Sequence, residues 1–165
     1  MAHDRSVDAL DALILTLFAE DPRIGVLEAS RRLGVARGTV QARLDRLTAR
    51  GVVRGWGPEV DPLALGFAVT AFVTLEISQG AHSQIETALG AVPEVLEVHT
   101  VTGPGDMLVR LVARTNTDLQ RVIDEVLAVT GVLRCSTVIA LANGVAFRTM
   151  PLVKAIAVES TAEQR

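Results

Sequence analysis

The second half of the chain alternates between strand-like and helix-like segments in an order that few folds accommodate. Four apolar and β-branched segments are typical of strands: residues 67–77, 95–102, 107–113 and 132–141. Residues 83–91 and 116–129 instead carry apolar side chains at helical spacing. The order strand-helix-strand-strand-helix-strand predicts an antiparallel four-stranded sheet with both helices on one face, which is a ferredoxin-like arrangement.

The predicted strands show little alternation between apolar and polar residues, so both faces of the sheet are expected to be apolar. The two helices cover one face, and a second copy of the same sheet is the natural cover for the other. The sequence therefore predicts a homodimer. After a turn signal at Asn143 and Gly144, residues 145–152 are expected to add a short edge strand, and residues 153–165 to form a C-terminal tail that is polar and frayed from about residue 158.

The first part of the chain has a helical rhythm. Residues 6–20 and 25–33 are predicted to form two helices, with Ser6 as the first N-cap and Gly34 as a left-handed C-cap. A third helix, residues 36–50, is predicted to follow Gly34 after only one residue. Its apolar positions recur as one helical stripe: Val40, Leu44 and Leu47. Two helices joined by a short turn with glycine, the second one basic, predict a helix-turn-helix.

The third helix is strongly basic on the side away from its stripe. Between residues 36 and 54 there are five arginines and one acid, Asp45. A helix of this kind fits the major groove of DNA, where Arg and Gln bond base edges. An ordinary amphipathic helix with a solvated basic face remains the alternative. The candidate contacts for bases or nearby phosphates, most of them expected to face outward, are Arg37, Thr39, Gln41, Arg43 and Arg46.

Residues 52–60 contain glycines between short extended runs and are predicted to form a β-hairpin wing. Arg54 is the candidate for a phosphate contact from this wing, and Trp56 is expected to pack beneath it rather than to lie on DNA. The chain is thus divided into a winged helix-turn-helix domain (1–60), a linker (61–66), a ferredoxin-like domain (67–152) and a tail (153–165), an α+β fold class.

Composition excludes several functions. The 165 residues include one cysteine, Cys135, and no tyrosine, which argues against a disulfide framework, a multi-cysteine metal site and an aromatic surface for single strands. No signal region, membrane span, catalytic triad, phosphate loop or metal spacing is apparent, so we expect a cytoplasmic, nucleoid-associated protein without enzymatic activity, metal or cofactor. Residues 1–60 carry net charge +1 and residues 61–165 net charge −4, which favours DNA binding by the front half alone.

Several motifs in this order resemble one family of regulators. They are LDALILTL at 10–17, RIG at 23–25, RLDRLTARGVV at 43–53, DPLALG at 61–66, TGPGDMLVR at 102–110, CSTVIAL at 135–141 and VAFRTMPL at 145–152. Together they resemble the leucine-responsive regulatory protein/AsnC family of bacterial and archaeal transcription regulators. The resemblance implies operator binding by the front domain, and a rear domain that binds amino acids or related effectors, pairs subunits and assembles dimers into tetramers or octamers.

The turn at residues 103–106 has features of a ligand site. Pro104 and Gly105 are expected to form a type II turn with positive φ at Gly105, where backbone amides can approach a carboxylate while Asp106 accepts from an amino group. A tight hairpin in which Asp106 simply bonds its own backbone is the alternative. The resemblance places the effector near this turn and a subunit interface, and the candidate ligand residues are Thr100, Thr102, Gly103, Gly105, Asp106, Ser136 and Thr137.

Two departures from the family pattern matter. Ala36 replaces the usual Ser or Thr N-cap of the third helix, and the turn lacks the aromatic residue that often lines the effector site. The sequence predicts an effector-responsive, sequence-specific transcription regulator that binds a roughly palindromic operator. The alternatives are an effector-independent architectural DNA-binding protein and a haem-biosynthesis decarboxylase of similar architecture, in which His99 is the one histidine placed to act.

Overall fold

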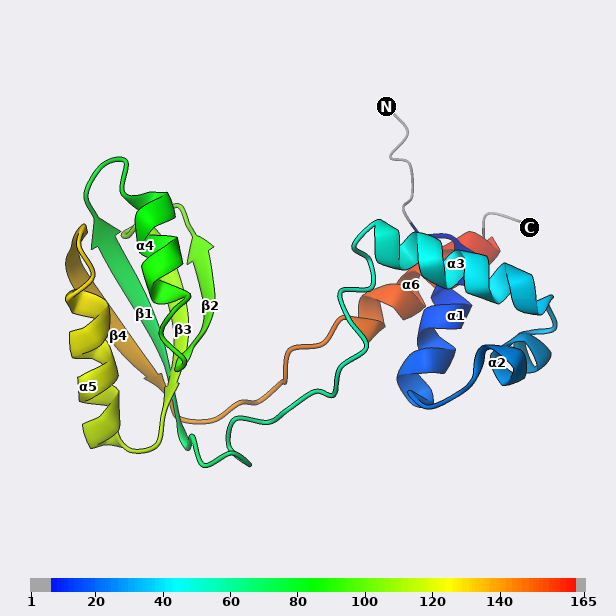
Figure 1. Cartoon of the computed structure of the whole chain (residues 1–165), viewed down its shortest axis with the longest axis horizontal. Helices are drawn as coiled ribbons and strands as arrows, with labels where there is room; N and C mark the ends of the chain where they lie inside the picture. The colour runs from blue at the N-terminus through cyan, green and yellow to red at the C-terminus, as the bar shows by residue number, and fades with distance from the viewer. Residues whose placement is uncertain (1–6, 163–165) are drawn as a thin grey trace. The chain divides into compact units, whose positions relative to one another are not determined.

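The computed structural model describes residues 7–162, which form two compact units (Figure 1). The helical unit contains residues 7–58 together with residues 145–162, and the sheet unit contains residues 59–144. The chain therefore leaves the helical unit, builds the sheet unit and returns. This differs from the expected division, because residues 145–152 group with the helices and not with the sheet.

The helical unit contains α1 (Ala9–Glu20), α2 (Val26–Leu33), α3 (Arg37–Ala49) and α6 (Met150–Ala162). Helix α1 starts later than expected: its N-cap is Asp8, while Ser6 lies outside the described residues. The Asp8 carboxylate accepts from the Asp11 amide at 2.9 Å and the Asp11 carboxylate from the Asp8 amide at 3.2 Å, a reciprocal capping box. Gly34 ends α2 with φ of 67°, as predicted.

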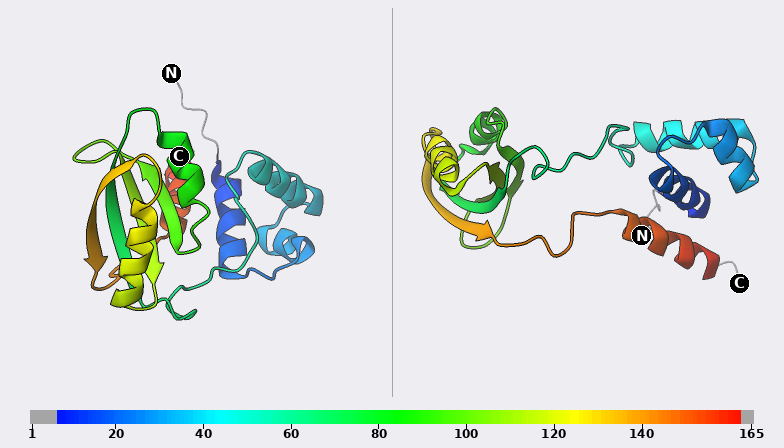
Figure 2. Two further views of the ribbon diagram at one scale, coloured as in Figure 1. Left: turned by 60° about the vertical axis from the view of Figure 1, so that its left-hand side comes forward. Right: turned by 90° about the horizontal axis from the view of Figure 1, so that it is seen from below.

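Helix α6 replaces both the expected edge strand and the expected tail. It lies beside α1 in Figures 1 and 2. Its Val153, Ile156 and Ala157 pack against the buried side chains of Ala12 and Leu47 from α1 and α3. The spacing of these three apolar residues is helical, so α6 completes a small core that the first three helices leave open.

The predicted wing is absent. Residues 51–60 contain no strand. The amides of Val52 and Val53 both donate to the Leu47 carbonyl, at 2.9 and 3.2 Å, so the chain wraps around the C-terminal end of α3. Trp56 was expected to pack beneath this wing, but its ring instead meets Phe18 of α1 edge-on, with the ring centroids 5.6 Å apart, and 57 % of the residue stays exposed.

The sheet unit confirms the predicted order of strands and helices. Its four antiparallel strands lie in the order β2-β3-β1-β4, and α4 and α5 cover the same face of the sheet (Figure 2). The elements are β1 (Val69–Ile77), α4 (His82–Leu89), β2 (Val95–Thr100), β3 (Met107–Ala113), α5 (Asn116–Leu127) and β4 (Val132–Ala140). The core lies between this face and the helices, and its fully buried members include Val73, Leu75, Ile85, Val109 and Val122.

The other face of the sheet, the open face, is more polar than expected. Along β1 burial alternates with a period of two residues, because neighbouring side chains point to opposite faces, and β4 follows this alternation only in part. The open face carries the exposed apolar residues Phe72 and Val138, which are cross-strand partners. Beside them, Arg110 pairs with Glu97 at 3.7 Å. The open face is therefore a mixture of apolar and charged side chains.

None of the helices within residues 7–162 combines the length and apolar character that a membrane crossing requires.

Candidate functional site

Helix α3 presents its apolar stripe to the core and its polar side chains outward. Val40, Leu44 and Leu47 are buried as predicted. Ala36 at the N-cap offers no side-chain hydrogen bond, and the first turn contains no acid. The N-terminal end of α3 therefore carries the positive end of the helix dipole without a neutralising group, which suits a phosphate.

The predicted DNA-contacting residues of α3 divide into two groups. Arg37 and Gln41 are exposed and Thr39 is half-buried, and the Gln41 amide nitrogen donates to Asp45 at 2.8 Å. Arg43 and Arg46 lie against α1 instead of facing freely outward. This differs from the expectation for the basic face, since helical spacing alone does not show which side of α3 meets a neighbour.

A charge cluster of two acids and two arginines joins α1 to α3. Arg43 donates to Asp8 and, at 3.0 Å, to Asp11, and Arg46 donates to Asp11 at 2.7 Å. The Asp11 side chain is 1 % exposed, whereas those of Arg43 and Arg46 keep 25 % and 44 % exposure. The two guanidinium groups thus neutralise a buried carboxylate and fix the angle between the two helices.

The cluster also affects the titration of Asp8. Partial burial acts to raise the pKa of this carboxyl, but hydrogen bonds from the Asp11 amide and Arg43, together with the charges of Arg43 and Arg46, lower it below 3.8. Because its pKa is lower in the folded state, Asp8 stabilises the fold fully at pH values above the pKa that it has in the unfolded chain. This contribution is lost as the pH falls through the folded-state pKa.

Asp8 and Asp11 were not among the residues selected from the sequence. The signal that identifies them is a matched spacing: the two acids are three residues apart at the start of α1, and Arg43 and Arg46 are three apart on α3. Residues at this spacing share one helical face, so two such pairs can meet along a helix-helix contact. Arg54 is exposed on the segment that follows α3.

The turn before β3 lies directly against the end of β1. The Asp106 amide donates to the Leu75 carbonyl at 2.8 Å, and the Asp106 carboxylate accepts from the Ile77 amide at 2.8 Å. These bonds join the turn to β1 next to the irregular pairing at Glu76 and Ile77. One carboxylate oxygen of Asp106 therefore has a structural partner, but this partner is the backbone of β1, 29 residues away in the sequence, and not the local backbone of the turn.

The assignment of positive φ within this turn was wrong. Gly103 has φ of 130°, whereas Gly105 is not among the glycines with positive φ. Gly105 is required for a different reason: a Cβ there would overlap Thr74 Cγ2 and lie 3.0 Å from the Leu75 carbonyl oxygen. The turn contacts β1 so closely that there is no room for a side chain.

The remaining ligand candidates do not all share one surface. Ser136 pairs with Thr74 on the open face, whereas Thr137 pairs with the buried Val73 on the helix-covered face. Thr100 also belongs to the helix-covered side, where its hydroxyl lies 3.4 Å from Glu86 of α4. Gly103, Gly105 and Asp106 thus form one local site, with exposed Thr102 in the same turn.

The described residues contain no group of three or more His, Cys, Asp or Glu side chains that is placed to hold a metal ion. His99 is exposed on the open face, with its ring nitrogen 3.7 Å from Glu97.

Comparison with known proteins identifies both units. Residues 7–48 match the model of the AsnC-type helix-turn-helix domain, and residues 70–149 match the model of the Lrp/AsnC ligand binding domain. The HTH-type transcriptional regulator FL11 of Pyrococcus furiosus is 30 % identical over 135 residues, covering 82 % of this chain and 89 % of the relative. The chain belongs to the Lrp/AsnC family. It is a DNA-binding transcriptional regulator with a ligand-binding domain, and not an enzyme.

Solved structures of Lrp/AsnC proteins share the fold. The structure of Escherichia coli AsnC superimposes with a TM-score of 0.81 at 24 % identity, covering 88 % of this chain and 99 % of that one. A feast or famine regulatory protein from M. tuberculosis, complexed with L-methionine, gives a TM-score of 0.76 at 24 % identity, with coverage of 86 % and 97 %. Helix α6 begins at Met150 and thus lies outside both matched domain models.

Proposed function

We propose that this Lrp/AsnC regulator reads operator DNA with α3 and that an amino acid, bound at the turn of residues 103–106, controls it. The observation that carries the DNA proposal is the polarity of α3, which buries one stripe and presents an uncapped N-terminus flanked by exposed Arg37 and Gln41. We infer action in the cytoplasm on nucleoid DNA.

The proposed DNA contacts have unequal roles. Arg37, Thr39 and Gln41 lie in the first turns of α3, the part of a recognition helix that meets base edges. Arg54 contacts backbone phosphate from the segment after α3. Arg43 and Arg46 hold α3 against α1, and the exposed part of Arg46 adds positive charge near the phosphates.

A pair of arginine variants tests this docking. Arg37→Ala is expected to weaken binding to a duplex selected by the wild-type protein by about tenfold, the loss of one good base contact. Its melting temperature should stay unchanged because Arg37 is exposed. The measurement is a gel-shift titration at fixed salt, with Arg23→Ala, an exposed arginine in the same unit, as control. Equal affinities for wild type, Arg37→Ala and Gln41→Ala would reject the docking.

The open face of the sheet supports a homodimer. Phe72 and Val138 are 39 % and 64 % exposed there. The buried Arg110 Nε has no hydrogen-bond partner within the described residues, and an acceptor from a second copy would satisfy it. Two α3 helices in such a dimer would meet a roughly palindromic operator with half-sites about 34 Å apart. Further assembly into tetramers or octamers follows from the family resemblance.

The effector proposal rests on the turn at residues 103–106 and on the relative that was solved with L-methionine. Gly103 has open space where a Cβ would lie, so a carboxylate can approach the backbone there, and the second oxygen of Asp106 has no hydrogen bond within the described residues. Thr102, Thr100, Ser136 and Thr137 are the proposed additional hydroxyl contacts, although they lie on different surfaces of one subunit.

A thermal-shift screen with the twenty amino acids tests the effector. The amino acid that binds should increase the free energy of unfolding of the sheet unit by about 2.7 kcal/mol at a hundredfold excess over its Kd. The melting temperature of that unit should rise accordingly. Sedimentation velocity with and without that amino acid then reports whether it changes the assembly. Twenty unchanged melting curves would contradict an amino-acid effector, while a monomer at all concentrations would contradict the dimer.

A further inference from the structure

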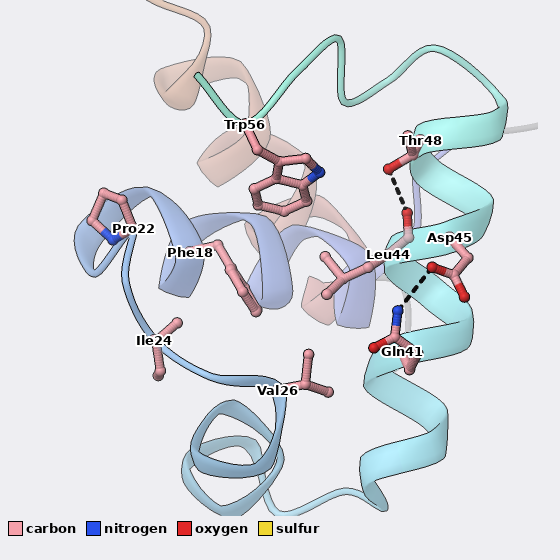
Figure 3. Close-up of a pocket in the computed structure, with 9 residues that line it drawn as sticks. All are labelled: Phe18, Pro22, Ile24, Val26, Gln41, Leu44, Asp45, Thr48 and Trp56. Carbon is pink, nitrogen blue, oxygen red and sulfur yellow. Dashed lines mark hydrogen bonds between the residues drawn. The ribbon is translucent and has the colours of Figure 1, made fainter. Parts of the chain in front are cut away.

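A pocket of about 300 Å³ opens in the helical unit beside α3 (Figure 3). It lies at the lower end of the size range of small-molecule sites. It lies outside the ligand-binding domain, and Gln41 is the one proposed DNA contact among the residues that line it. Its lining comes from the end of α1, the loop before α2, the first residue of α2, one side of α3 and the segment after α3: Phe18, Pro22, Ile24, Val26, Gln41, Leu44, Asp45, Thr48 and Trp56.

One wall of the pocket is apolar and aromatic. Ile24 and Leu44 are buried at its base. The rings of Phe18 and Trp56 meet edge-to-face at an interplanar angle of 67°, and Figure 3 shows the Trp56 side chain close to Phe18 and Leu44. The exposed Trp56 is the single tryptophan of the chain. An apolar ligand in this position would remove part of the indole surface from water.

The opposite edge, formed by α3, offers mainly hydrogen-bond acceptors. The Thr48 hydroxyl donates to the Leu44 carbonyl at 2.8 Å, and Gln41 donates to one oxygen of Asp45 at 2.8 Å. These bonds use the Thr48 proton and one Gln41 proton. The second Asp45 oxygen has no hydrogen bond within the described residues, and Asp45 brings a negative charge. The edge is thus complementary to a cationic donor.

We propose that this pocket binds a small primary amine that carries an aromatic or branched apolar group. The apolar group lies against Phe18 and Trp56, and the ammonium group donates to Asp45 and Thr48. A cation next to the indole face gains a further electrostatic attraction. Free amino acids are poor occupants, since their carboxylate would lie near Asp45. The site therefore differs in ligand class from the amino-acid site proposed for the sheet unit.

Occupancy of the pocket has a consequence for α3. Gln41 is a proposed DNA contact, and its amide bonds Asp45 in the free protein. An ammonium group at Asp45 competes with this bond and changes the orientation of Gln41. The amine is therefore expected to alter operator affinity, a consequence that rests on the proposed DNA docking, whereas binding of the amine itself does not.

Trp56 provides a direct measurement, because the chain has no tyrosine and no other tryptophan. Phenethylamine is titrated into the full-length protein while tryptophan emission is recorded. The matched ligand is 3-phenylpropionate, which carries a carboxylate in place of the ammonium group on the same phenylethyl group. We expect a saturable change with the amine and none with the acid. Asp45→Asn should lower the affinity for the amine by about threefold, which corresponds to the loss of one exposed ion pair.

The chain supplies a matched control variant. On α5, Gln120 donates to Asp124 at 2.8 Å with the same spacing that Gln41 and Asp45 have on α3, so Asp124→Asn should leave amine binding unchanged. Thr48→Arg, at an exposed position, fills the pocket edge with positive charge and should abolish binding. A response without saturation, equal responses to amine and acid, or wild-type affinity in both Asp45→Asn and Thr48→Arg would overturn the proposal. Failure of DNA binding alone would leave it intact.

Discussion

Asp11→Ala is expected to destabilise the helical unit by about 2–3 kcal/mol, because it leaves two guanidinium groups without their buried partner. Asp11 is 1 % exposed and bonds both Arg43 and Arg46. The loss should be smaller than for a fully buried pair, since both arginines retain contact with water. The change also removes half of the capping box at the start of α1.

Thermal unfolding followed by Trp56 emission measures this effect, because the only tryptophan lies in the helical unit. Asp45→Ala is the control, as it removes an exposed acid from α3 whose side-chain hydrogen bond within the described residues comes from Gln41 on the same helix. Asp11→Asn separates charge from volume and should recover part of the loss. A melting temperature for Asp11→Ala equal to that of Asp45→Ala would show that the charge cluster does not hold α1 and α3 together.

The second large effect is expected for Gly105→Ala in the sheet unit. The new methyl group would overlap Thr74 Cγ2 and crowd the Leu75 carbonyl, so either the turn or β1 must move. Overpacking of this kind costs about 1–3 kcal/mol. Because Asp106 bonds both Leu75 and Ile77, displacement of the turn is also expected to weaken effector binding.

Thermal unfolding of the sheet unit is followed by far-UV circular dichroism. The transition followed by Trp56 emission, which reports on the helical unit, should keep its wild-type midpoint temperature. Gly144→Ala is the matched control, because a Cβ there meets nothing within 4 Å and its φ is not positive. Adding Thr74→Ser to Gly105→Ala removes the overlapping methyl group and should restore part of the stability. If Gly105→Ala melts like Gly144→Ala, the close contact with β1 carries no energetic weight.

The strand and helix order of the sheet unit was predictable because it depends on local periodicity. Apolar side chains at a spacing of two or of three to four residues indicate the element type directly, and β3 begins and ends at the predicted residues. The polarity of the open face was not predicted. It depends on which residues the register places side by side, such as Arg110 with Phe72 and Glu97.

Helix α6 and the missing wing show a second limit. Residues 145–158 contain apolar positions that suit either a strand or a helix, and the choice depended on a partner distant in sequence, the core of Ala12 and Leu47. Residues 52–60 lost their expected pairing because Val52 and Val53 bond the end of α3 instead. In both segments a nonlocal or terminal contact overrides a weak local preference.

The sequence by itself determined the elements of the sheet unit, the first three helices, the buried stripe of α3 and the family of regulators, because each is encoded in the spacing of neighbouring residues. Only the tertiary structure decided that Arg43 and Arg46 form ion pairs with Asp8 and Asp11. It also decided that Gly105 contacts β1 and that Trp56 and Asp45 line one pocket. These relations join residues far apart in the chain. Their geometry follows from how helices and strands pack, which local periodicity does not specify.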